Sequence, residues 1–155
     1  IIVGFMILSI YDFRWKTLPT SVIYINSIIA LTGLVVYLIA SGNYSVLISR
    51  IWGVLIGGGI FRVIYQISDG KWIGGGDVRL GFLLGLIVGG PINAVLMLMI
   101  ASFSALLFTV PQLLSSKLKV KSQIPFGPFL ILGCVMVFLC SPSMHSFLVS
   151  RYLIP

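Results

Sequence analysis

Long apolar runs separated by short polar links dominate this chain. The runs are continuous rather than alternating, and the longest reach the roughly 20 residues that an α-helix needs to cross the hydrocarbon core of a bilayer. Six apolar segments are expected, at Ile1–Ile10, Ser21–Ala40, Ser45–Ile67, Val78–Gly90, Pro91–Leu114 and Pro128–Cys140. The pattern predicts an all-α fold, a polytopic transmembrane helical bundle of about six spans, in a single membrane-embedded domain over residues 1–155.

Composition strengthens this prediction and excludes a soluble fold. The chain is 59% hydrophobic and only 8% charged, and its mean hydropathy is +1.16. A soluble domain of this size cannot bury that much apolar surface, so the lipid bilayer is the expected surrounding. The formal charge of +7 does not indicate nucleic acid as a partner, because the basic residues lie mainly in the short links between apolar runs.

The basic residues are unevenly distributed among those links. The first, third and fifth links, with the residue just past the third, hold Arg14, Lys16, Lys71, Arg79, Lys117, Lys119 and Lys121. The second and fourth links hold none. Links rich in Lys and Arg remain in the cytosol, so the odd-numbered links are predicted to be cytosolic and the N-terminus to face outward. Asp12 and Asp77 then lie on the same, cytosolic side of the membrane.

Acidic residues are few, and two of them border predicted spans. The chain holds Asp12, Asp69 and Asp77 and no Glu. A carboxylate at membrane depth costs roughly 2.5 to 3.5 kcal/mol on insertion scales, which makes it a functional candidate. Asp69 lies in Ser-Asp-Gly, a turn sequence, and is expected to be solvated. Asp12 and Asp77, brought together in a bundle, can share one proton as the two carboxyl groups of an aspartyl protease do.

Each of these two aspartates also has a structural interpretation. Asp12 can be a juxtamembrane charge paired with Arg14 or Lys16, although a carboxylate at the C-terminal end of a helix faces the negative end of the helix dipole. Asp77 can be an ordinary N-cap for the fourth span. The run 74–76 before it is all glycine, which leaves an open backbone where an extended substrate can form hydrogen bonds.

Two other classes of protein remain compatible with these residues. Intramembrane aspartates can form the cation or proton site of a small transporter or channel subunit. A structural membrane subunit would use both only as caps. Glycines at Gly53, Gly57, Gly81, Gly85 and Gly89 have the spacing that lets membrane helices pack closely, and packing is their expected role.

No metal or other cofactor is expected. Cys134 and Cys140 do not form a C-x-x-C pair, and His145 has no ligand partner nearby in the sequence. A structural zinc site needs such a cluster of ligands.

Three motifs together resemble those of type IV prepilin peptidases. Gly74-Gly75-Gly76-Asp77 followed by Val78-Arg79-Leu80 resembles their G-x-G-D motif. Asp12, followed by Leu18-Pro19, resembles their first aspartate motif, and Pro125-Phe126-Gly127-Pro128 resembles their late Pro-Phe-Gly-Pro motif. The first motif often ends in Pro-Asp or Pro-Asn where this chain has Pro19-Thr20, and Lys is frequent where it has Arg79.

The resemblance implies a multi-pass aspartyl endopeptidase of the prokaryotic inner membrane, with its active site near the cytosolic face. Asp12 and Asp77 would be catalytic, and Gly74, Gly75, Gly76 and residues 125–127 would form the substrate-binding loops. The implied substrates are prepilin or pseudopilin precursors, from which a short basic leader is cut, usually after a Gly. An archaeal preflagellin-type peptidase is a near alternative with the same chemistry.

The resemblance does not extend to the methyltransferase activity that many members of the family have. Many family members have a cysteine-rich zinc loop and methylate the new N-terminus, and nothing in residues 1–155 resembles that region. The chain is therefore expected to be a peptidase only.

Since Asp77 lies at a helix N-terminus, we expect Asp77 to hold the negative charge of the pair and Asp12 the proton.

Overall fold

A computed structural model of the chain describes residues 1–42, 44–114 and 125–152, and the side chains of all of these except 41 and 141–152. It contains the helices α1 (Ile2–Trp15), α2 (Thr20–Ser41), α3 (Ser45–Ile67), α4 (Gly75–Val88), α5 (Pro91–Leu114) and α6 (Gly127–Tyr152). The predicted all-α bundle is confirmed. The basic link with Lys117, Lys119 and Lys121, and the side chain of His145, lie outside this description.

The six helices are not equally suited to crossing a bilayer. Within the described residues, three helices, α2, α3 and α5, are long and apolar enough to do so. Helices α1 and α4 have 14 residues each, and the apolar part of α6 covers Gly127–Cys140. The expected segments are all helical, but three of them are shorter than the roughly 20 residues of a full span.

Several helix boundaries differ from the sequence prediction, and two of them bear on the aspartates. Helix α1 continues to Trp15, so Asp12 lies in its last turn rather than in a link. Helix α4 begins at Gly75, with Gly74 as its N-cap in extended conformation. Asp77 is therefore a residue of the first turn of α4 and not its N-cap. Two of the three glycines expected in a loop are helical.

Helices α3 and α4 pack through glycines, as the spacing predicts. A Cβ atom on Gly57 would lie 2.9 Å from the carbonyl oxygen of Gly81, and one on Gly53 would lie 2.5 Å from that of Gly85. Since real Cβ atoms essentially never approach so closely, only glycine permits this backbone contact. The contact fixes α4, and with it Asp77, against the longer helix α3.

Arg50 of α3 closes the far end of α4. Its guanidinium donates hydrogen bonds to the carbonyl oxygens of Leu86, at 2.8 Å, and of Ile87. The N–H of Gly90 donates to the carbonyl oxygen of Ser49 at 2.9 Å. The two bonds from Arg50 satisfy carbonyl groups that α4 leaves free at its C-terminus, and a carbonyl group without a partner is costly in a membrane.

Helices α5 and α6 form a second close pair, which joins α1 through aromatic rings. A Cβ atom on Gly133 would lie 2.5 Å from the carbonyl oxygen of Met97. The ring of Phe129 lies 5.6 Å from that of Phe108 and 6.5 Å from that of Phe13, measured between centroids. The start of α6 is thus packed between α5 and the last turn of α1.

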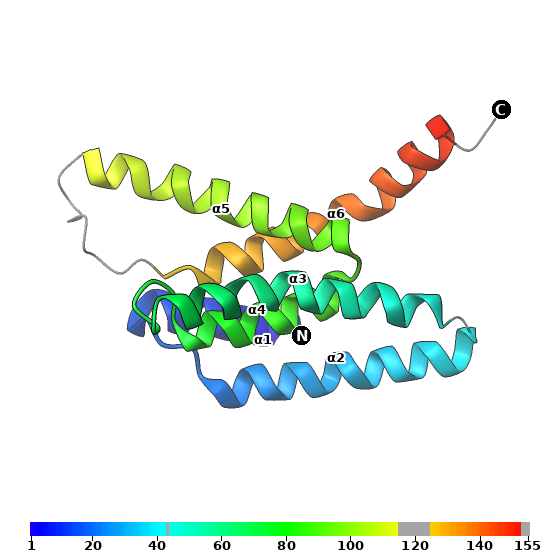
Figure 1. Cartoon of the computed structure of the whole chain (residues 1–155), viewed down its shortest axis with the longest axis horizontal. Coiled ribbons are helices and arrows are strands. Elements are labelled where there is room, and N and C mark those ends of the chain that lie inside the picture. Colours follow the sequence, from blue (N-terminus) through cyan, green and yellow to red (C-terminus); the bar gives the residue numbers. More distant parts are fainter. Residues whose placement is uncertain (43, 115–124, 153–155) are drawn as a thin grey trace.

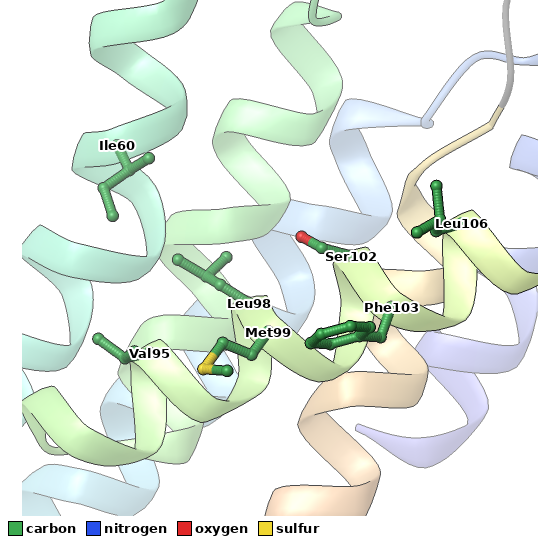
Figure 2. Close-up of a pocket in the computed structure, with 7 residues that line it drawn as sticks. All are labelled: Ile60, Val95, Leu98, Met99, Ser102, Phe103 and Leu106. Atoms are coloured by element: carbon green, nitrogen blue, oxygen red, sulfur yellow. The ribbon is translucent and has the colours of Figure 1, made fainter.

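A groove of about 510 Å³ opens between α3 and α5. Figure 2 shows seven side chains that line it, of which six are apolar and the seventh is Ser102. It contains none of the predicted site residues, so it does not contribute to the site described next.

Candidate active site

Three helix ends converge at one end of the bundle. Figure 1 shows the end of α1 and the starts of α4 and α6 at the same end of the molecule. They carry Asp12, Asp77 and Gly127, one residue from each of the three motifs. The fold therefore brings together residues that are up to 115 positions apart in the sequence.

Asp12 is buried and bound to the start of α6. Its side chain is 5% exposed, and its Oδ2 atom accepts a hydrogen bond of 3.0 Å from the N–H of Gly127. Gly127 is the first residue of α6, whose N-terminal N–H groups lie at the positive end of the helix dipole. The carboxyl group thus lies between the negative end of α1 and the positive end of α6, which offsets the unfavourable position expected for it.

Asp77 is half-buried in the first turn of α4. A Cβ atom on Gly74 would lie 3.5 Å from its Oδ2 atom, so the carboxyl group folds back toward its own N-cap residue. A backbone hydrogen bond from Gly74 stabilises the charged form, but burial acts against it more strongly. None of the glycines at 74–76 has a positive φ.

The two carboxyl groups lie close enough to influence each other's charge. Both are outside the three helices of spanning length. Burial raises the pKa of Asp12, and a hydrogen bond from Gly127 partly opposes the rise. Burial and the negative charge of Asp12 together raise the pKa of Asp77 to about 6. Both shifts favour the protonated form, so the pair can hold one shared proton.

The surroundings of Asp12 favour the opposite assignment of charge from the one expected from the sequence. We expected Asp77 to be the better anion because it lies at the N-terminus of its own helix. Asp12, however, is hydrogen-bonded to the N-terminus of another helix, α6. Asp12 is therefore the member of the pair favoured as the anion, and Asp77 the member favoured as the acid.

Leu18 joins the three motifs physically. A Cβ atom on Gly76 would lie 3.0 Å from the Cβ atom of Leu18, and one on Gly127 would lie 3.5 Å from its Cδ2 atom. The leucine side chain thus occupies the space between the start of α4 and the start of α6. Small residues at 76 and 127 let both helix starts approach it.

Phe126 anchors the segment before α6 to the bundle. Its ring lies 5.8 Å from that of Phe61 in α3, in a T-shaped arrangement. Pro125, which precedes it, is half-buried. Among the predicted loop residues, Gly127 contacts an aspartate directly, whereas Phe126 packs against α3.

The basic side chains near the site have other partners. Arg14 lies over the ring of Trp15, with its Cζ atom 5.1 Å from the ring centroid, rather than beside Asp12. Arg79 donates a hydrogen bond of 2.9 Å to the hydroxyl of Thr20. The two positions at which the motifs depart from the common pattern are therefore bonded to each other. The largest effect on the pKa of each aspartate is burial, which raises it, and not a basic neighbour.

A metal site of the usual kind is not formed by these residues. In the part of the chain that the structure describes, no group of three or more His, Cys, Asp or Glu side chains is placed to hold a metal ion. The arrangement consists of two carboxyl groups with unequal surroundings. Such a pair can act as a general base and a general acid.

Comparison with protein families agrees with this arrangement. The model of the type IV leader peptidase family matches residues 1–110, which include both aspartates. The chain belongs to the type IV leader peptidase family. Membership implies peptidase activity on substrates of the prepilin type, and the apolar helices make this leader peptidase family member a membrane protein. Comparisons with curated proteins and with solved structures gave no match.

Sequence reasoning missed two features of the site in this leader peptidase family member. Leu18 was noted only as part of a motif, and its position between the two glycines was not predicted. The direct bond from Gly127 to Asp12 was not predicted either. The motif at residues 125–128 was the available signal, since Gly between bulky residues indicates close approach of another group.

Proposed function

We propose that this chain is a membrane aspartyl endopeptidase that removes the short basic leader from type IV prepilin-like precursors at the cytosolic face of the membrane. The observation that carries the proposal is that the end of α1 and the start of α4, which carry Asp12 and Asp77, lie at the same end of the bundle, where the negative charge of Asp12 raises the pKa of Asp77. Paired carboxyl groups of this kind perform peptide hydrolysis without a metal or a covalent intermediate.

In the first step of the proposed reaction, ionised Asp12 accepts a proton from a water molecule, and the water oxygen attacks the scissile carbonyl carbon. Asp77 donates its proton to the carbonyl oxygen, which gives a neutral tetrahedral diol. In the second step, Asp12 returns its proton to the nitrogen of the leaving amine while the carbon–nitrogen bond breaks. Asp77 recovers a proton from one hydroxyl of the diol, and both carboxyl groups end in their initial states.

The cytosolic location rests on the charges around the site. The end of α1 carries Arg14 and is followed by Lys16, the link between α3 and α4 carries Lys71, and the start of α4 carries Arg79. Figure 1 shows these helix ends at the same end of the bundle. The positive-inside rule assigns that end to the cytosol. A precursor with its own membrane helix can then reach the site laterally, with its leader in the cytosol. The leader is basic like these links, so charge attraction to the enzyme does not explain its recognition.

Cleavage of a pilin-like precursor in membranes tests the proposal. We expect Asp12→Asn and Asp77→Asn to abolish cleavage at unchanged membrane levels. Asp69→Asn, which alters an exposed aspartate in a turn, is the matched control and should cleave normally. Full activity of either active-site variant would remove that residue from the chemistry. Faster cleavage of a preflagellin-type precursor would assign the chain to that neighbouring substrate class instead.

A further inference from the structure

We infer that Gly127 is a positioning residue for Asp12, and that its main-chain N–H, at the start of α6, holds the general base in place. The inference rests on the proposed function and goes beyond it, because it assigns to the Pro-Phe-Gly-Pro segment a role in the chemistry rather than in contacting substrate. It begins from one bond, the 3.0 Å hydrogen bond from this N–H to Oδ2 of Asp12.

The N–H group is fixed on both sides by aromatic packing. Phe126 lies against Phe61 of α3 at 5.8 Å, and Phe129 lies against Phe108 of α5 at 5.6 Å. Phe129 also contacts Phe13 of α1, but the contacts with α3 and α5 hold the N–H in place without the Asp12 side chain. A donor fixed in this way can orient a carboxylate instead of following it.

The side-chain position of residue 127 explains why it is a glycine. Its φ is not in the left-handed region, so conformational freedom is not the reason. A Cβ atom there would lie 2.6 Å from Oδ2 of Asp12, closer than a carbon and an oxygen can approach. The absence of a side chain therefore lets the carboxylate reach the N–H.

The bond leaves one carboxylate oxygen, Oδ1, for the remaining partners of Asp12. The charged group that faces Asp12 is Asp77 of α4. From α6 and from the link before α2, the facing residues are Gly127 and Leu18, neither of which can ionise. With Oδ2 held by the N–H, Oδ1 is the oxygen that can accept the proton of a water molecule.

The test is Gly127→Ala, with cleavage measured at steady state over a range of pH. The methyl group displaces the carboxylate from its bond, and we expect kcat to fall about 100-fold while KM stays unchanged. The acidic limb of the pH profile should move to higher pH, because losing the N–H donor raises the pKa of Asp12. An unchanged kcat and an unchanged pH profile would overturn the inference.

Two control variants separate positioning from packing. Gly133→Ala introduces a methyl group 2.5 Å from the carbonyl oxygen of Met97. It should lower thermal stability without moving the pH profile. Gly59→Ala meets nothing within 4 Å and should change neither. If Gly133→Ala moves the profile as Gly127→Ala does, the effect is structural and the inference fails.

A second measurement uses the unaltered protein, in case Gly127→Ala does not fold. Phe126–Gly127 is the one Phe-Gly pair in the sequence, so labelling the carbonyl carbon of Phe and the nitrogen of Gly isolates a single NMR signal. We expect the amide proton of Gly127 to move downfield as Asp12 ionises, and to show no such change in Asp12→Asn. A pH-independent signal in the parent protein would overturn the inference.

The outcomes distinguish this inference from the proposed function. If Asp12→Asn cleaves normally, the proposed function fails. If Asp12→Asn is inactive but Gly127→Ala has the parent's kcat and pH profile, the function stands and the positioning role fails.

Discussion

Asp77 is predicted to reduce the stability of the folded protein near neutral pH. Its carboxyl group is half-buried in the first turn of α4. Burial and the charge of Asp12 raise its pKa from 3.8 to about 6. The perturbation is Asp77→Asn, which keeps the size and shape of the side chain and removes the charge.

The sign follows from the direction of the shift. A raised pKa means that the folded protein prefers the protonated carboxyl group more than the unfolded chain does. The stability that this preference provides is fully present below about pH 4 and is lost as the pH rises through about 6. At neutral pH the folded protein therefore carries a charge that the unfolded chain holds at lower cost.

The magnitude follows from the same two values. One unit of pKa corresponds to about 1.4 kcal/mol, so a rise from 3.8 to about 6 corresponds to about 3 kcal/mol. For a chain of this size, roughly 2 to 4 °C of Tm accompany each kcal/mol. Asp77→Asn should then raise the Tm near neutral pH by roughly 6 to 12 °C.

Thermal unfolding in detergent, followed by tryptophan fluorescence, provides the assay. We expect the variant to exceed the parent in Tm at about pH 8 and to match it at about pH 4. Asp69→Asn controls for the loss of one negative charge, because Asp69 is exposed in a turn. A variant that is no more stable than the parent at high pH, or whose advantage does not grow with pH, would refute the reasoning.

Two further predictions concern the helix contacts that place Asp77. Gly85→Ala should destabilise the fold by about 1 to 3 kcal/mol and reduce cleavage, because its methyl group would meet the backbone of Gly53. Equal Tm values for Gly85→Ala and Gly59→Ala would contradict this prediction. Arg50→Gln should lower the free energy of unfolding by about 1 to 3 kcal/mol, since carbonyl groups at the end of α4 lose a donor. The control is Arg62→Gln, which alters an exposed arginine and should leave the unfolding temperature unchanged.

The sequence predicted the parts of the fold that depend on local pattern. Apolar runs identified all six helices, and glycine spacing indicated close helix packing, which the structure shows between α3 and α4. Helix ends were less predictable, because the first turn of α4 begins with two glycines, which have low helix propensity. Contact with α3 and with Leu18 stabilises that turn, and such tertiary contacts are not visible in a local pattern.

The relation between the two aspartates illustrates the same limit. In the sequence, Asp77 lies at the start of a predicted helix and Asp12 at the end of one, and the helix dipoles then favour the negative charge on Asp77. The structure adds a second N-terminus beside Asp12, from a helix that begins 115 residues later in the chain. Through-space contacts of that kind determine which carboxyl group is charged, and no property of either residue's own segment indicates them.

The same contact gives the third motif, at residues 125–128, a part in the proposed mechanism. An isolated Asp12 would be a buried carboxylate at the negative end of α1, which favours the protonated and hence non-basic form. The start of α6 supplies the N–H and the positive dipole end that counter this tendency. Asp77 supplies the proton partner but, being acidic, makes ionisation of Asp12 harder. In the proposed mechanism, the general base therefore forms only where α6 reaches the end of α1, and residues 125–129 would belong to the catalytic unit although none of them can ionise.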